Sequence, residues 1–308
     1  MPVRAMRYGH KALAFANDTT VLGDFADAEY KADGIQSRFF RKGTKFYIET
    51  ENEEGENEAF EVVYTIGHYP LQQYMVAFPG GRYQVSRQSW DSREGRWFHQ
   101  YAGDTIPAGD YLHWTGNGQN WNTMCASCHS TDLKKNYDIT SDTYDTQYEE
   151  VTIGCESCHG PGSRHIALAT EGAYSKGSYG QIAKSAIVSS CMPCHARRSD
   201  VHPEWDHNQH LLQSFIPQII SDDFYFADGQ VREEDYVYGS FVQSRMFHEG
   251  VNCMDCHSPH SGKLIAEGNA LCRQCHEPAY DSPAHHFHPE GTAAAECVNC
   301  HMPERTYM

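Results

Sequence analysis

The chain has 308 residues and a mass of 34.9 kDa, with 41 acidic against 24 basic side chains and a formal net charge of −17. This excess of carboxylates opposes binding to nucleic acids or anionic membranes, which requires a surplus of lysine and arginine. A mean hydropathy of −0.64 and the lack of any apolar run of about 18 residues exclude a transmembrane helix. We therefore expect no membrane-spanning segment, and basic proteins or cations as partners.

Residues 1–120 contain no cysteine and show the aromatic and β-branched runs of antiparallel strands. Glycine-containing turns separate these runs, as expected for hairpins. The expected strands are Arg38–Lys42 and Thr44–Ile48 about Gly43, Phe60–Ile66, and Leu71–Phe78 and Arg82–Ser86 about Pro79–Gly81. Residues 49–61 carry seven glutamates, and because flexible like charges repel, we expect a solvated loop there instead of a metal site.

The remaining residues, 121–308, contain six Cys-x-x-Cys-His motifs, which use all 12 cysteines. This spacing is the attachment signature of c-type haem, in which two thiols bind the porphyrin edge and the adjacent imidazole is the proximal iron ligand. A zinc site or a redox dithiol needs no histidine directly after the second cysteine, so the six histidines favour haem. The motif residues are Cys125, Cys128 and His129; Cys155, Cys158 and His159; Cys191, Cys194 and His195; Cys253, Cys256 and His257; Cys272, Cys275 and His276; and Cys297, Cys300 and His301.

Six covalently attached haem c groups among residues 121–308 leave about 30 residues for each, so the macrocycles should fill most of the core. Regular structure should be sparse there, apart from an apolar stripe of helical spacing in Asp235–His248 and a second one in Leu211–Ile220, which Pro217 interrupts. We predict an α+β chain: an N-terminal antiparallel β-rich scaffold domain over residues 1–120, and a mostly irregular, haem-packed domain with a few helices over residues 121–308.

The sixth ligand of each iron decides the chemistry, because two histidines close the haem at low potential, whereas an empty position admits substrate. Thirteen histidines lie outside the motifs, which is enough to close six haems. His260 follows His257 by three residues, a span of about 10 Å that is too short to reach around the same ring, so it should serve a neighbouring haem. The residues predicted to be distal ligands from their positions are His113, His165, His248, His260 and His286, with His285 and His288 as substitutes for the last.

Several longer phrases resemble a group of bacterial multihaem c-type cytochromes that are often fused to tetratricopeptide repeats. They are Leu22–Phe25, Pro70–Tyr74, Leu112–Gly116, Gln119–Cys125, Cys158–His165, Asp228–Gln230, Tyr238–Phe241 and Cys300–Pro303. The resemblance covers nearly the whole chain and implies an exported electron-transfer protein. It also implies that His10, which matches a histidine-rich segment beside a haem in that group, is the sixth distal ligand. The group's usual N-terminal haem motif and C-terminal repeats do not occur in this sequence.

These observations predict electron transfer through a chain of six closely packed bis-His haems, with redox proteins or copies of the chain itself as partners. Two alternatives stay open: a subunit of an extracellular conductive filament, and an oxyanion reductase with one open haem. No catalytic residue is predicted outside the haem sites. Haem c is attached outside the cytoplasm, so we expect a periplasmic or extracellular protein. The first ten residues contain no apolar run of leader length, and we expect the sequence to begin inside a longer chain.

Overall fold

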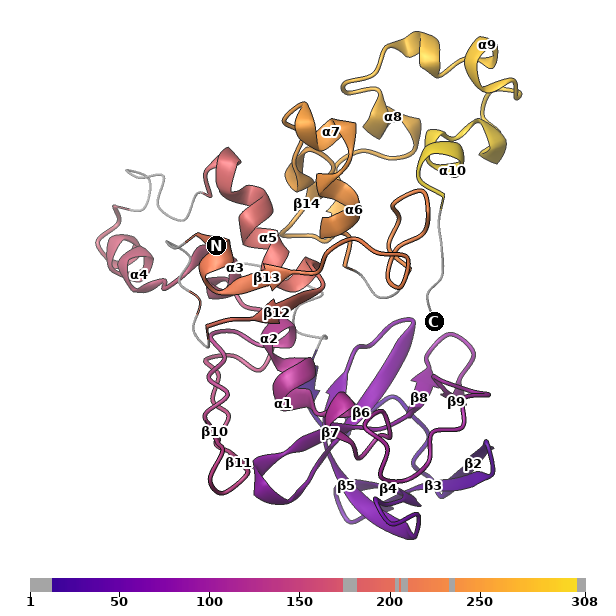
Figure 1. The fold of residues 1–308 in the computed structure, drawn as a ribbon, viewed down its shortest axis with the longest axis vertical. Helices are drawn as coiled ribbons and strands as arrows, with labels where there is room; N and C mark the ends of the chain where they lie inside the picture. The colour runs from indigo at the N-terminus through magenta and orange to yellow at the C-terminus, as the bar shows by residue number, and fades with distance from the viewer. Residues whose placement is uncertain (1–12, 174–181, 203–204, 206–209, 233–235, 304–308) are drawn as a thin grey trace. The chain divides into compact units, whose positions relative to one another are not determined.

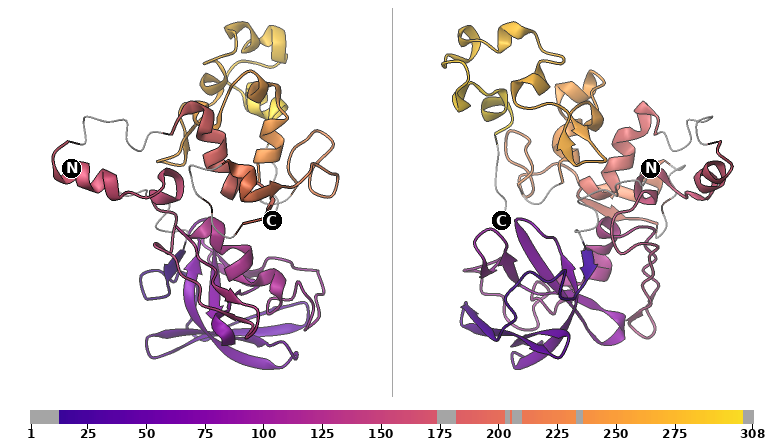
Figure 2. Two further views of the ribbon diagram at one scale, coloured as in Figure 1. Left: turned by 60° about the vertical axis from the view of Figure 1, so that its left-hand side comes forward. Right: turned by 180° about the vertical axis from the view of Figure 1, so that it is seen from behind.

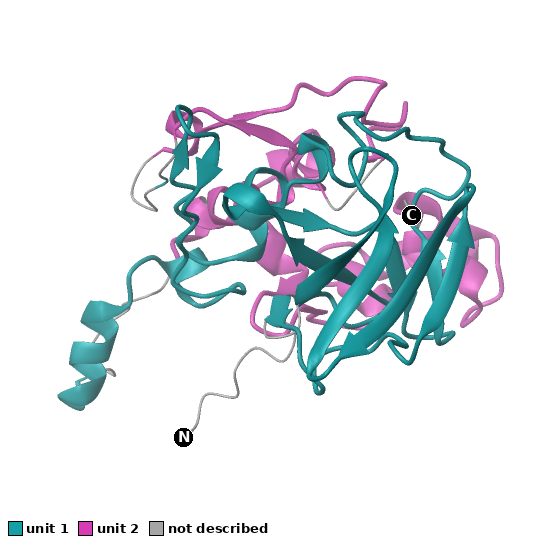
Figure 3. Ribbon diagram, turned by 90° about the horizontal axis from the view of Figure 1, so that it is seen from below, with its two compact units in different colours: residues 1–180, 203–208 teal, residues 181–202, 209–308 magenta. Residues whose placement is uncertain are grey.

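The computed structural model describes residues 13–173, 182–202, 205, 210–232 and 236–303 (Figure 1). The packing of the backbone divides the chain into two compact units, residues 1–180 with 203–208 and residues 181–202 with 209–308 (Figure 3). The predicted α+β class is confirmed, because an antiparallel β-rich region precedes a region of short helices and irregular chain. The predicted domain boundary near residue 120 follows composition and stays a prediction.

The first unit is built on a nine-stranded antiparallel sheet with the order β2-β3-β4-β5-β6-β8-β9, in which β1 also pairs with β5 and β7 with β6. The sheet curves so that β9 lies next to β2, where the backbone N–H of His99 donates to the Tyr30 hydroxyl at 3.1 Å. The strands are β1 (Leu13–Phe15), β2 (Ala28–Ala32), β3 (Ile35–Lys42), β4 (Lys45–Glu51), β5 (Asn57–Ile66), β6 (Leu71–Ala77), β7 (Tyr83–Val85), β8 (Gln88–Asp91) and β9 (Arg96–His99).

Both predicted hairpins are confirmed. Strands β3 and β4 pair up to Lys42 opposite Lys45, and β6 and β7 flank the 3-10 turn η2 (Pro79–Gly81). Gly81 has a φ of +73° and packs against the carbonyl of Tyr144, so the second turn requires a residue without a β-carbon.

The prediction of a loop over residues 49–61 holds only for residues 52–56, which include Glu53, Glu54 and Glu56. Strand β4 continues to Glu51 and β5 begins at Asn57, and these two residues pair with each other. Thr50 of β4 is buried, and Glu49 and Glu51 on either side of it are partly exposed. The other four glutamates therefore belong to strands with a polar outer face, a pattern that resembles a loop when composition alone is considered.

Aromatic side chains fill the interior of the sheet. Phe39 and Trp97 stack with ring centroids 3.5 Å apart, and Phe25 meets both rings edge to face. Such packing gives the first unit a protein core of its own. The buried members of this cluster are Phe25, Phe39, Phe46, Ile48, Val62, Tyr74, Val76, Trp97 and Trp114.

The rest of the first unit follows the sheet in the chain as short helices and one narrow hairpin. Its elements are η3 (Asn117–Gln119), α1 (Trp121–Met124), α2 (Ala126–His129), β10 (Tyr137–Asp138), β11 (Thr143–Tyr144), α3 (Glu156–His159) and α4 (Ser163–Thr170). Strands β10 and β11 form the slender arm labelled in Figure 1.

The second unit consists of short helical turns joined by irregular chain, as the views in Figure 2 show for its orange and yellow segments. No described helix in the chain is long and apolar enough to cross a membrane. The elements of this unit are η5 (Lys184–Ala186), α5 (Ile187–His195), β12 (Arg198–Asp200), η6 (Leu211–Gln213), β13 (Phe215–Pro217), α6 (Tyr238–Val242), α7 (Arg245–His248), η7 (Cys253–Asp255), β14 (His257–Ser258), β15 (Lys263–Leu264), α8 (Asn269–Cys272), η8 (Pro278–Tyr280), α9 (Pro283–His286), η9 (Ala293–Ala295) and α10 (Cys297–His301).

The two predicted helical stripes of this unit have different outcomes. The stripe over Asp235–His248 is helical but broken into α6 and α7, because Ser244 caps α7 by accepting from the backbone N–H of Phe247. The stripe over Leu211–Ile220 is not a helix: it forms η6 and then β13, which ends at Pro217 and pairs with β12. Proline lacks the N–H that a helix interior needs, so the stripe cannot continue as one helix.

Candidate haem sites

Each of the six motifs begins on or next to a short helical turn, and in the fourth motif the chain passes into strand β14 at His257. The second cysteine and the histidine of four motifs fall within α2, α3, α5 and α10, while the other two motifs occupy η7 and α8 with the residues that follow them. A helical turn places residues i, i+3 and i+4 on one side, so both thiols and the imidazole of a motif can meet one macrocycle. None of the 12 cysteines takes part in a disulfide, which leaves each thiol able to attach haem.

The β-sheet holds the first motif in place through α1. The Trp121 side chain is 1% exposed and packs with sheet residues, together with Ala126 from inside the motif. Asn122 accepts a hydrogen bond from the backbone N–H of Tyr83 at 2.8 Å and donates to the carbonyl of Gly81 at 3.1 Å. The β-sheet therefore fixes the position of the first attachment site.

A threonine between the first and second motifs joins them within the first unit. The Thr131 hydroxyl lies 2.7 Å from the hydroxyl of Ser157, which is inside the second motif, and donates to the carbonyl of Thr152 at 2.7 Å. It also accepts from the backbone N–H of Gly154 at 2.7 Å. These bonds fix the first two attachment sites next to each other.

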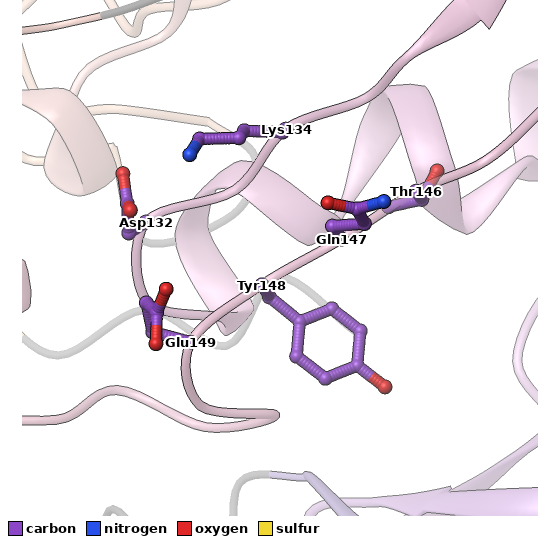
Figure 4. A pocket seen from close by; sticks show the side chains of 6 residues that line it. All are labelled: Asp132, Lys134, Thr146, Gln147, Tyr148 and Glu149. Atoms are coloured by element: carbon purple, nitrogen blue, oxygen red, sulfur yellow. The ribbon is translucent and has the colours of Figure 1, made fainter.

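The chain between these two motifs also lines a polar cavity of about 330 Å³ (Figure 4). Figure 4 shows Asp132 and Glu149 on one side of it and Lys134 above them, with the Tyr148 ring pointing away. The Tyr148 hydroxyl instead meets that of Tyr64 in the sheet at 2.8 Å. Mixed charges suit a small polar solute better than a flat apolar ring, so we do not assign a haem to this cavity.

In the second unit, cysteines of successive motifs contact one another. The Cys253 thiol is hydrogen-bonded to Cys191, and the thiol of Cys272 is hydrogen-bonded to Cys297. Cys256 and Cys275 lie close enough for their thiols to interact electrostatically. The third to sixth motifs therefore follow one another as a contiguous series. The hydrogen bond with Cys191 also lowers the pKa of the Cys253 thiol.

The residues around the motifs fit haem. The His129 Nδ1 atom is buried and has no hydrogen-bond partner among the described groups, and burial lowers the pKa of this imidazole. The ring is then neutral, which is the form that ligates iron. Several large apolar side chains of the second unit are solvent-exposed, with Phe287 84% and Ile219 82% exposed. Apolar surface of this kind suits packing against porphyrin rings.

The predicted distal ligand His113 is placed in the β-rich part of the first unit. Its side chain is fully buried, with Nε2 2.8 Å from Glu51 Oε1 and Nδ1 2.7 Å from Thr115 Oγ1. Both ring nitrogens are thus engaged, and His113 could bind iron only if one of these bonds were broken. The placement favours a structural role for this residue.

The other predicted distal ligands lie in both units. His10 falls outside the described residues. His165 is exposed on α4, His248 ends α7, and His260 is exposed in the turn between β14 and β15. His286 ends α9 and keeps a buried Nε2 atom without a hydrogen-bond partner among the described groups. Among the described groups, His286 therefore keeps one ring nitrogen without a hydrogen-bond partner, whereas both ring nitrogens of His113 are engaged.

The sequence analysis missed two asparagines that hold the motifs of the second unit. Asn252 caps η7 just before Cys253, in a reciprocal capping box with Asp255. Asn269 donates to Asp281 Oδ1 at 2.7 Å and to the Ala295 carbonyl at 2.9 Å, and accepts from the backbone N–H of Cys297 at 2.8 Å. The first has a sequence signature, Asn-x-x-Asp, whereas the second depends on tertiary contacts.

Two protein-family models match parts of the chain. The model for cytochrome c554 and c-prime matches residues 106–160, which include the first two motifs, and the doubled CXXCH model matches residues 246–281, which include the fourth and fifth. Together with the motif geometry, these matches define the class of the protein: it is a multihaem c-type cytochrome with covalently bound haem. No curated protein matches the sequence.

Among solved structures, the fold is similar to the crystal structure of the outer cell wall cytochrome OcwA. The two share 17% sequence identity with a TM-score of 0.50, and the match covers 71% of this chain. The chain matches only 56% of the length of OcwA. At this identity the likeness concerns the fold alone.

Proposed function

We propose that this chain carries electrons outside the cytoplasm through six covalently attached haem c groups whose irons are each closed by two histidines. The proximal ligands are His129, His159, His195, His257, His276 and His301. When bound, the haems supply the redox chemistry. The chain's own residues attach them, ligate the iron and hold neighbouring rings close together.

The contiguous series of motifs carries this proposal. The contacts between Cys191 and Cys253 and between Cys272 and Cys297 bring the attachment edges of successive rings together, as the bond of Thr131 to Ser157 does in the first unit. An electron transfer chain needs such closely spaced centres along its length. A single catalytic haem would not require two neighbouring attachment sites in the first unit and a series of four in the second.

The chemistry of haem attachment and the fold both support an exported location, periplasmic or extracellular. Haem c is attached outside the cytoplasm, and the similar fold of OcwA belongs to an outer cell wall cytochrome. The net charge of −17 favours a partner with a basic docking surface, because opposite charges steer the encounter of redox proteins. A redox protein or a further copy of the chain with a local basic patch would meet this requirement.

The proposed function can be tested through the axial coordination of the haem irons. We expect electron paramagnetic resonance of the oxidised protein to show only low-spin iron, and the reduced protein to bind carbon monoxide poorly, because two imidazoles occupy both axial positions. Denatured protein, in which distal ligands are released, provides the positive control for carbon monoxide binding. A high-spin signal equal to one haem in six would contradict the proposal and favour an oxyanion reductase.

A further inference from the structure

Two imidazoles in the second unit are separated by the distance found between two histidine ligands of one metal ion. The rings of His285 and His301 are 6.2 Å apart between centroids and lie within 6° of parallel. Two metal–nitrogen bonds of about 2 Å, plus about 1.1 Å from each nitrogen to its ring centre, add up to about 6.2 Å. The separation therefore equals that of two imidazoles bound to opposite sides of one iron.

The chain around both rings holds them in this relation. His301 ends α10, whose first residue donates its backbone N–H to Asn269, and the same Asn269 side chain donates to Asp281, two residues before α9. His285 lies on α9, and the Tyr280 ring meets it edge to face at 5.3 Å and 85°. One asparagine thus ties the turn that carries His285 to the sixth motif.

There is also space beside His285 for a bulky group. A cavity of about 400 Å³ is lined by Glu277, Ala279, Tyr280, Ala284 and His285. Its lining residues come from η8, α9 and the residue before η8, so the cavity borders His285 on the side of Tyr280.

The neighbouring histidines fit this role less well. His286 and His288 are also nearly parallel at 6.3 Å, but neither belongs to an attachment motif, so neither supplies a proximal ligand. The Nδ1 atom of His286 already accepts the backbone N–H of His288 at 3.2 Å. The pair of His285 and His301, in contrast, joins a proximal ligand to a second imidazole.

We propose that His285 is the distal ligand of the haem attached at Cys297 and Cys300, in place of the sequence-predicted His286. The assignment rests on the proposed electron-transfer function with bis-His haems. Because His285 follows His276 by nine residues, the segment that leaves the fifth motif closes the sixth haem. His276, Tyr280, His285 and His301 then form a continuous row of rings, with His276 and Tyr280 6.5 Å apart. This arrangement holds the last two haems close together.

The test compares His285→Ala with the matched variants His286→Ala and His288→Ala in the full exported chain. We expect all three to keep six haems by intact mass. Only His285→Ala should show a high-spin signal and carbon monoxide binding equal to one haem in six. Added imidazole should return that haem to low spin, because it replaces the lost side chain without repairing any other defect.

If His286→Ala or His288→Ala opens a haem and His285→Ala does not, the assignment is wrong while the proposed function stands. An open haem in the unchanged protein contradicts the proposed function instead, and if His285→Ala then adds no second open haem, the assignment fails as well. Should His285→Ala not be exported, His285→Met keeps a sixth ligand and should raise the potential of one haem in a redox titration. Potentials that do not move with this variant would overturn the assignment.

Discussion

Without its haems the second unit should lose its ordered structure while the β-sheet of the first unit stays folded. The clusters of buried apolar residues lie in the first unit, around Trp97 and around Trp121. In the described part of the second unit the buried apolar residues, such as Met192, Leu211 and Phe215, belong to neither cluster, and Ile219 and Phe287 are mostly exposed. A segment that buries so little apolar surface cannot offset its conformational entropy, so haem must supply the core.

This prediction can be tested by replacing the eight cysteines of the third to sixth motifs with alanine in the full chain. Hydrogen exchange followed by mass spectrometry should show rapid exchange over residues 182–202 and 236–303, with protection retained over residues 35–99. Replacing only the four cysteines of the first two motifs is the matched control and should leave the second unit protected. Continued protection of residues 236–303 without attached haem would show that this unit has a protein core of its own.

Loss of His113 should destabilise the first unit without opening a haem. In His113→Ala the Glu51 carboxylate loses its 2.8 Å partner inside the protein, and Arg87 lies 3.9 Å from the same carboxylate oxygen. A largely buried carboxylate that keeps only its longer contact to Arg87, together with the cavity left by the ring, should lower the free energy of unfolding by about 3 kcal/mol. Denaturant unfolding followed by tryptophan fluorescence measures this change.

The control for this variant is His68→Ala, in the loop between β5 and β6, where we expect a change below about 0.5 kcal/mol. The spin state separates the two roles considered for His113. If His113→Ala produces high-spin iron equal to one haem in six, then His113 is a distal ligand, as its position twelve residues before Cys125 predicts. Unchanged low-spin iron together with lowered stability establishes the structural role.

The parts of the fold that depend on local sequence were predictable. The hairpin of β3 and β4 was predicted because its strands alternate about Gly43, and the six attachment sites because the covalent chemistry of haem c fixes the spacing of its residues. The end of β4 and the start of β5 were included in the predicted loop because strands with a polar outer face have the same composition as a loop. Register, not composition, decides that Glu51 pairs with Asn57.

Ligand pairing could not be predicted in the same way, because it depends on contacts between distant residues. His113 is close to the first motif in sequence, yet its partner Glu51 is 62 residues away. His285 and His286 are neighbours in sequence, but only the ring of His285 lies parallel to that of His301. A shift of one residue on α9 changes which histidine lies beside the sixth motif, and no sequence pattern distinguishes His285 from His286.

The intact mass of the exported protein under denaturing conditions tests the central claim most directly. Thioether bonds survive unfolding, so a chain that uses all six Cys-x-x-Cys-His motifs must retain six haem masses. We predict that the dominant species carries six covalently bound haems and that substitution of the two cysteines in any one motif removes one of them. A dominant species with fewer than six, or haem that separates from the unfolded chain, would contradict the account.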